Sequence, residues 1–416
     1  MSDTAASRRE RPLRAGERRT VALLGLPSLA LALAVTTVTT YLPVVARGFV
    51  GSTIVIGLVI GIEGLLAVWL PVIVGAWSDR LETRLGGRLP FLLAGSPVLV
   101  AGLVAMGFVS SLGSLAVAAL IFFLGYFLAS EPYRALYPDS IPDETAGRAQ
   151  GVQALWRGAG TALAVLGGGL LLSVGQAAPF ACFAVVYIAA VASFVLAMAR
   201  RGIPDEPSEQ RGGVGDQARH IAGLLRDKPT MRTALVAIAL WELSLGALKT
   251  FIVLYVTEGL GFSRTAASFM IGGVAVVVLV AAVGSGKVAD RVGETKVLRA
   301  ALPVYGLGML VPLAFSARWL IAAAVPFIAI GGGVIMALPY ALLMPLMPDD
   351  DHGAITGLYS LSRGVGTWLG PLLGGVAITA LAGSFTATRG YQAMWLVCSS
   401  AVLLSLVPLS RIPASA

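Results

Sequence analysis

The sequence has few charged residues and almost none of the residues that build metal or redox sites. Charged residues make up 12% of the chain and hydrophobic residues 57%, whereas soluble domains carry about 25% charged residues. There are only two cysteines and two histidines, and asparagine is absent, which excludes a disulfide framework, a histidine relay and an N-glycosylation acceptor. No Gly-x-x-x-x-Gly-Lys-Ser/Thr motif occurs, so the chain has no P-loop ATPase and we expect no cofactor. This composition predicts a protein of the lipid bilayer.

The hydrophobic residues are gathered in twelve long runs, each of about 20 residues or more, which is enough to cross about 30 Å of hydrocarbon as a helix. We therefore predict an all-α membrane protein with six transmembrane helices in each half. The division is a disordered basic tail (1–20), a six-helix bundle (21–199), a linker (200–231), a second six-helix bundle (232–410) and a short tail (411–416). The runs are 21–46, 54–77, 89–110, 114–138, 148–174, 177–199, 232–257, 266–286, 295–315, 318–346, 352–380 and 387–410.

Basic residues are distributed unevenly between the two sides of these runs. Of the 30 Lys and Arg residues, 22 fall on the side of the termini and the linker and four on the other, namely Arg47, Arg264, Arg318 and Arg389. Because cytoplasmic loops retain positive charge, this predicts a multi-pass protein of a cell membrane, and of a bacterial inner membrane from its composition, with both termini inside. The net charge of +8 is spread over short loops, so we expect no nucleic-acid partner and a monomer in the bilayer.

The second half of the chain repeats the first. Gly151–Thr161 and Gly357–Thr367 share the pattern Arg-Gly-x-Gly-Thr at the same place, and Pro142-Asp143 is matched by Pro348-Asp349. Such a duplication predicts two similar bundles related by a pseudo-two-fold axis, an architecture common among transporters.

A basic loop follows the second run and has a shorter copy in the second half. It reads Gly75-x-x-x-Asp-Arg and continues with further arginines and glycines to Pro90-Phe91, and the copy begins at Gly286. The glycines permit close helix approach, and a charged pair here can hold one arrangement of the halves closed. The loop resembles the signature of the major facilitator superfamily, and in its longer form that of the sucrose transporters and glycoside-pentoside-hexuronide cation symporters. The expected gating residues of the loop and its copy are Asp79, Arg80, Arg84, Arg88, Asp290 and Arg291.

A second charged block ends the fourth run. Glu131 and Arg134 are one helical turn apart and can pair, which offsets part of the cost of about 2.5–3.5 kcal/mol for each charge near the bilayer centre. The alternative is a purely structural pair within one helix. The block resembles a Pro-x-Arg-Ala-x-x-x-Asp run of the sucrose transporters, which implies that Arg134 faces a central cavity, with Tyr133 beside it, and that Asp139 lies near its cytoplasmic end.

The second run departs from the resembled branch. Pro71 and Ala67 stand where the cation-coupled glycoside symporters carry acidic ligands, so no sodium site of that kind is expected. Glu63, one turn further out, is able to titrate. The first run contains no acidic residue, unlike that of plant-type sucrose carriers.

Four further charges lie inside predicted spans. Trp241-Glu242 and Lys249 are expected on roughly one face, where they either bind a polyhydroxylated or zwitterionic solute or pair with Glu131 and Arg134 across the halves. Arg157 and Arg363 head the duplicated segments about 15 Å from a helix end. We expect them to lock the two halves rather than to contact substrate.

The sequence therefore predicts a secondary carrier that rocks its halves around a central site. The main interpretation is uptake of a small hydrophilic solute, a sugar or glycoside, together with protons, with Glu131 as the coupling carboxylate. The alternative is proton-driven export of drugs or a natural product. A third reading is an assembly factor or sensor of the same fold that transports nothing.

Overall fold

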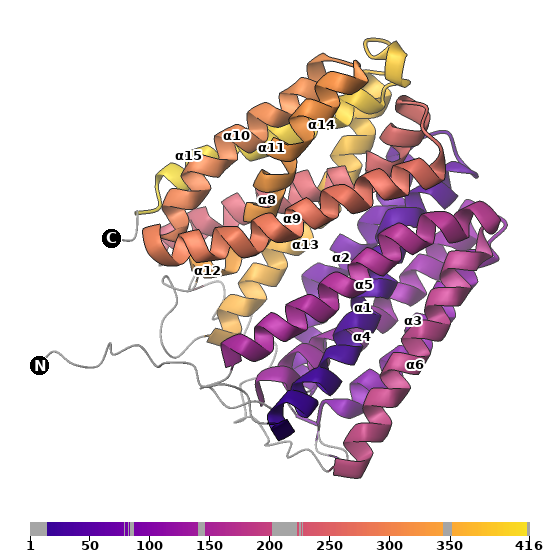
Figure 1. Cartoon of the computed structure of the whole chain (residues 1–416), viewed down its shortest axis with the longest axis vertical. Coiled ribbons are helices and arrows are strands. Elements are labelled where there is room, and N and C mark those ends of the chain that lie inside the picture. Colours follow the sequence, from indigo (N-terminus) through magenta and orange to yellow (C-terminus); the bar gives the residue numbers. More distant parts are fainter. Residues whose placement is uncertain are drawn as a thin grey trace, which may run out of the picture.

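The computed structural model describes residues 15–78, 87–139, 146–201, 228–343 and 352–413, together with positions 80, 81, 83, 223 and 226. The predicted Asp79, Arg84 and most of the two tails and the linker lie outside these residues. The described part of the chain is helical and contains no strand (Figure 1).

Six long helices form the first half of the molecule. Each corresponds to one predicted run, with ends that differ by a few residues. The helices are α1 (Ala15–Arg47), α2 (Thr53–Ser78), α3 (Leu89–Gly107), α4 (Leu112–Asp139), α5 (Ala146–Val174) and α6 (Ala177–Arg201).

The second half contains the remaining six predicted spans, some of them interrupted. A five-residue π-helical turn, η2, continues α8, and short 3-10 turns, η4 and η5, precede α14. The elements are α8 (Pro229–Leu254), η2 (Tyr255–Gly259), α9 (Arg264–Val292), α10 (Glu294–Ala314), α11 (Arg318–Ala337), α12 (Pro339–Leu343), α13 (His352–Ala380), η4 (Thr386–Thr388), η5 (Tyr391–Ala393), α14 (Met394–Leu404) and α15 (Leu406–Ser410).

Two predicted spans are broken where proline prevents a continuous helix. The run 318–346 is divided into α11 and α12 immediately before Pro339, and the last run is divided into α14 and α15 at Ser405, three residues before Pro408. Proline lacks the backbone N–H needed for the helical ladder and clashes with the preceding turn. The hydrophobic pattern alone did not predict these breaks.

Helix packing repeats between the halves. In the first half α1 contacts α5 and α6, α2 contacts α4, and α3 contacts α4 and α6; in the second half α8 contacts α13 and α14, α9 contacts α11, and α10 contacts α11 and α14. The main contacts between halves are also equivalent, because α2 packs on α13 as α9 packs on α5, and α1 also contacts α8. The duplicated sequence therefore folds into two pseudo-symmetric six-helix bundles, as predicted.

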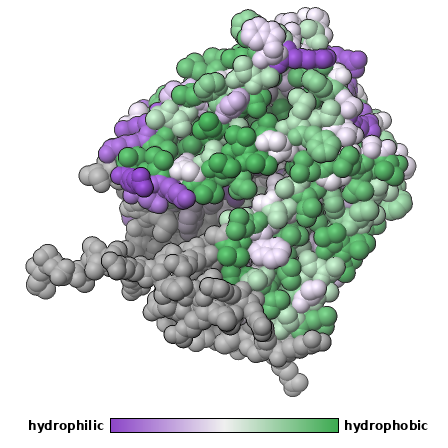
Figure 2. Space-filling view, viewed as in Figure 1, coloured by the Kyte–Doolittle hydropathy of each residue, from purple (hydrophilic) through white to green (hydrophobic). Residues whose placement is uncertain are grey.

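The outer surface is suited to hydrocarbon. Eleven helices of the described residues are long and apolar enough to span a bilayer, and the side in view is mostly hydrophobic, with hydrophilic residues gathered toward the ends of the helices (Figure 2). The twelfth long helix, α13, has 29 residues but contains Arg363 and several glycines. It lies between α2 and α8, and Arg363 on it is 39% exposed.

Candidate functional site

Charged side chains from both halves meet between the bundles. Arg134 of α4 interacts electrostatically with Arg363 of α13, and Glu63 of α2 interacts with Lys249, Arg363 and Glu242 of the second half. These residues lie well inside transmembrane helices, where a charge on the lipid side would be strongly unfavourable. Because these charged side chains interact across the interface between the halves, they face the interior of the protein and not lipid.

The predicted pair on α4 is present. Arg134 donates a hydrogen bond from an Nη atom to Glu131 Oε1 at 3.2 Å. The Arg134 side chain is 49% exposed and that of Glu131 15%. Arg134 also interacts electrostatically with Arg363 and Tyr359 of α13, so the half-exposed arginine is on the side of α4 toward the other half.

A second ion pair forms within the other half. Arg363 Nε donates to Glu242 Oε1 at 2.7 Å, and the side chains are 39% and 11% exposed. The Arg363 guanidinium also lies 5.6 Å from the ring centre of Tyr359. The alternative in which Glu242 pairs with Arg134 across the interface is not seen in this structure, where each of the two carboxylates pairs with an arginine of its own bundle.

The structure does not bring Trp241 into this group, and the Tyr133 hydroxyl bonds to α1 although Tyr133 also interacts electrostatically with Arg157. The Tyr133 hydroxyl is buried against α1, where it contacts the Leu24 carbonyl oxygen and lies 2.7 Å from Ser28 Oγ. Trp241 is 1% exposed and donates from Nε1 to Ser405 Oγ at 2.7 Å. Each aromatic side chain thus packs inside its own bundle. The sequence grouped Tyr133 with Arg134 and Trp241 with Glu242 because they are adjacent in the chain. Adjacent residues of a helix nevertheless point in directions about 100° apart.

Close glycine contacts seal the interface at one end. A methyl group on Gly57 or Gly64 of α2 would collide with the backbone of α13 at Pro371 or Trp368, and one on Gly375 would collide with Thr53. At the other end of α2 and α9, Gly75 and Gly286 have no described neighbour within 4 Å of such a methyl group. Among the described residues, glycine-mediated contact between the halves therefore lies toward the end of Thr53, which we call the closed end, and no such contact occurs at Gly75 or Gly286, at what we call the open end.

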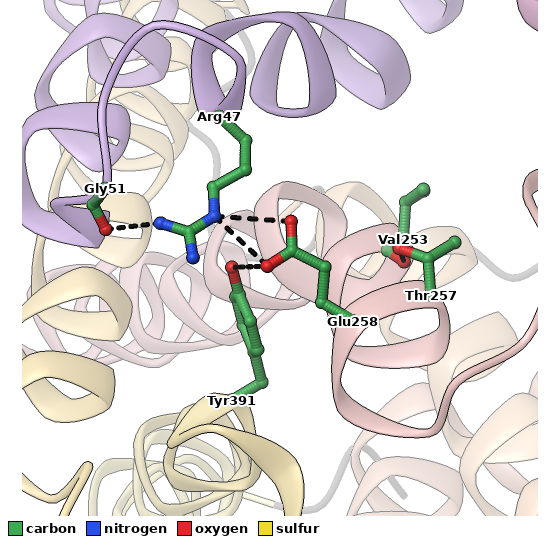
Figure 3. A network of polar contacts seen from close by, with 6 residues as sticks. All are labelled: Arg47, Gly51, Val253, Thr257, Glu258 and Tyr391. Carbon is green, nitrogen blue, oxygen red and sulfur yellow. Dashed lines mark hydrogen bonds and ion pairs between the residues drawn. The ribbon is translucent and has the colours of Figure 1, made fainter.

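An ion pair between the halves lies at the closed end (Figure 3). Arg47, the last residue of α1, donates from Nε to Glu258 Oε2 in the π-helical turn of the other half at 3.1 Å, and Tyr391 donates to the same oxygen at 3.1 Å. Arg47 also donates to the Gly51 carbonyl oxygen. We call Arg47, Glu258 and Tyr391 the closed-end latch. Sequence analysis missed it, although Arg47 was one of few basic residues on that side.

The predicted gating residues at the open end are only partly described. Arg80 is exposed, Arg88 is 9% exposed, and Asp290 and Arg291 are exposed at the last turn of α9. Asp139 ends α4, but its side chain lies outside what the structure describes. Their gating role remains a prediction, because Asp79, Arg84 and the side chain of Asp139 lie outside the described residues.

Three comparisons describe what the chain resembles. The family model "Major Facilitator Superfamily" matches residues 24–284 and 235–415. "Multidrug resistance protein MdtG" of Dickeya zeae is 25% identical over 334 residues, covering 78% of this chain and 77% of the relative. The protein of the same name from Salmonella typhimurium is 25% identical over 359 residues, covering 84% and 83%.

Solved structures share the fold at low identity. A bacterial homologue of the human lysosomal transporter Spinster, described as inward-facing and unoccupied, aligns with a TM-score of 0.74 and 15% identity over 98% of this chain and 96% of that one. The nucleoside transporter NupG aligns with a TM-score of 0.75 and 13% identity over 95% and 99%. These identities carry information on the fold alone.

Proposed function

The chain belongs to the major facilitator superfamily, is a transmembrane transporter and not an enzyme, and on that basis we propose that it exports small amphipathic molecules, drugs or a natural product, by proton-driven alternating access. The observation that carries the proposal is the group of charges contributed by both bundles to one water-accessible space between them. A solute bound there contacts both halves, so its binding energy favours movement of one half relative to the other.

The direction of transport rests on the relatives. Two relatives that align over more than three quarters of the chain are multidrug resistance proteins. None of the comparisons supports the sugar interpretation, which rested on short motifs in α2, α4 and the loop between α2 and α3. Those motifs cover only short stretches of the first half, whereas the relatives align over 78% and 84% of the chain. We therefore replace sugar uptake, the main interpretation from sequence, with the alternative of export.

The conformation fits the loading step of an exporter. The excess of basic residues on the side of the termini predicts that the open end faces the cytoplasm. In this state the Glu131–Arg134 and Glu242–Arg363 pairs are accessible from inside, and the closed-end latch blocks the outer side. Such a state admits a cytoplasmic solute and retains it until the halves rock.

We propose Glu131 as the coupling carboxylate. When Glu131 is ionised it holds Arg134 at 3.2 Å, and protonation weakens this charge-assisted contact. Arg134 is then released to bind solute or to change partners. Because protonation of Glu131 frees Arg134 to bind solute, proton transport and solute transport are coupled at this pair. Glu63, which forms no ion pair with the described residues, is the second acidic group able to carry a proton.

The test is transport in everted membrane vesicles, in which an exporter accumulates its substrate when the interior is acidified. We expect accumulation of at least one compound from a panel of amphipathic drugs, and efflux when the pH gradient is reversed. Glu131→Gln should abolish gradient-driven accumulation while leaving binding of the compound intact. Glu294→Gln, outside the interior group at the start of α10, is the matched control. Gradient-driven accumulation by Glu131→Gln at the wild-type rate would contradict the assignment.

A further inference from the structure

The interior charges do not balance. Three carboxylates, those of Glu63, Glu131 and Glu242, face four cations. Each net charge in a low-dielectric interior is costly unless it is paired. Among the described residues, one cation therefore has no acidic partner and is available to an anionic ligand. The four cations are Arg134, Arg157, Arg363 and Lys249.

Arg157 is the surplus cation. Arg134 and Arg363 each form an ion pair with a carboxylate of their own half. Lys249 is the charged residue that interacts most strongly with Glu63. The electrostatic neighbours of Arg157 are instead Arg134, Tyr126, Arg363 and Tyr133. Among the described residues no carboxylate forms an ion pair with it, and its side chain is exposed.

The side chain of Arg157 faces the interior rather than lipid. Its electrostatic neighbours lie on α4 of its own half and on α13 of the other. Thr161, one turn further along the same face of α5, lies 3.4 Å by its Oγ1 from Oγ1 of Thr36 on α1. The exposed Leu163 and Leu170 occupy a different face of α5. The exposure of Arg157 is therefore exposure to the space between the halves.

An aromatic surface adjoins the cationic group. The rings of Tyr340, in α12, and Tyr359, in α13, meet edge to face with centroids 5.5 Å apart. Tyr359 also lies beside Arg363 and interacts electrostatically with Arg134, and Tyr340 is 39% exposed. Aromatic faces bind planar apolar groups over a large area. An apolar ring on these tyrosines would have its acidic substituent close to the arginines.

From this arrangement we infer that the transported compound is an amphipathic organic anion, whose acidic group contacts Arg157 and whose aromatic body lies against Tyr359 and Tyr340. This inference rests on the proposed function only for the statement that the anion is exported. Binding of the anion depends on the arrangement of the interior residues and can be measured without transport. A planar guanidinium donates two parallel hydrogen bonds to a carboxylate, which gives this site its preference for the negative charge.

Three probes with one aromatic body test the inference: 2-naphthoate, 2-naphthylmethanol and 2-naphthylmethylammonium. Binding to the purified full-length protein is measured by calorimetry and by the shift in thermal midpoint. We expect wild-type protein to bind the anion most tightly. Arg157→Gln should lower the affinity for 2-naphthoate by about tenfold, corresponding to about 1.4 kcal/mol. Arg157→Lys keeps the charge and should retain part of the affinity. Arg264→Gln, at the closed end and exposed, should leave it unchanged.

Equal affinity of the wild type for the three probes, or unchanged 2-naphthoate binding in Arg157→Gln, would overturn the inference. So would an Arg157-dependent effect seen with lysophosphatidylglycerol and not with 2-naphthoate, because the site would then recognise a lipid headgroup. Failure of pH-driven export with anion binding intact contradicts the proposed function alone. Export without anion preference contradicts only the present inference.

Discussion

At the scale of residues, the arginines of Glu131–Arg134 and Glu242–Arg363 are each matched within their own bundle. A charge at the bilayer centre costs about 2.5–3.5 kcal/mol, and a partner on the same or an adjacent helix offsets part of that cost without restricting the other half. Neither pair ties one bundle to the other, and in the proposed coupling the Glu131–Arg134 pair is released by protonation of Glu131. Arg157 differs because no described carboxylate holds it, which leaves it available to a ligand.

Trp241 provides a test at this scale, because the structure places it outside the interior group. Trp241→Phe removes the hydrogen bond to Ser405 but keeps most of the buried ring. We expect a loss of about 1 kcal/mol of stability, seen as a lower thermal midpoint, with 2-naphthoate affinity and transport unchanged. Ser405 keeps its own bond to the Val402 carbonyl oxygen, so the loss stays small. Weaker 2-naphthoate binding in this variant would show that Trp241 contributes to the substrate site.

At the scale of elements, the important contact is the packing of α2 on α13. Backbone approaches backbone at Gly57, Gly64 and Gly375, with no space for a methyl group. Small residues permit such approach in membranes, where association depends on van der Waals contact rather than on release of water. The contact extends from Thr53 past the middle of α2, where Gly364 of α13 lies against Ala67 and Val68.

Gly57→Ala tests this contact. Its methyl group would collide with the Pro371 carbonyl oxygen, so we expect the closed end to open and the population of outward-open molecules to rise. Distances between spin labels placed across the closed end measure the change. Gly75→Ala is the matched control, because nothing described lies within 4 Å of its added methyl group. Identical distance distributions for both variants would show that the α2–α13 contact tolerates separation.

At the scale of the whole molecule, two kinds of contact keep one end shut. The glycine contacts are apolar and extend along the helices, whereas the closed-end latch is a polar contact whose charged members are about a quarter exposed, 28% for Arg47 and 24% for Glu258. Partly exposed ion pairs contribute about 0–1 kcal/mol. The latch therefore adjusts the balance between conformations and does not by itself determine it.

Arg47→Gln measures that contribution. Loss of up to about 1 kcal/mol changes the ratio of inward-open to outward-open molecules by about fivefold at most. We expect single-cysteine labelling from the outer side to accelerate accordingly, and high salt to produce part of the same effect in the wild type through screening. Arg264 is exposed at the same end, and Arg264→Gln should change neither the labelling rate nor its dependence on salt. A shift far beyond fivefold would mean that the latch, rather than the glycine contacts, keeps this end closed.

Much of the fold followed from patterns that repeat along the chain. The twelve runs, the duplication and the pairing of Glu131 with Arg134 depend on local spacing, and the structure contains all three. The choice between sugar uptake and drug export did not follow, because a short loop signature is shared by carriers of many solutes. The positions of Tyr133 and Trp241 were predicted incorrectly, since the direction of a helical side chain depends on where the neighbouring helices lie.

The sequence by itself determined that this protein crosses a bilayer in two related bundles, because hydrophobic length and internal repetition are properties of the chain alone. Only the tertiary structure decided which charges meet. Glu242 lies 121 positions before Arg363, and Glu258 lies 211 positions after Arg47. No spacing rule joins residues so far apart. Their distances are set by how the helices pack, and the free energy of a charge inside a membrane depends on its partner in space rather than on its neighbours in the chain.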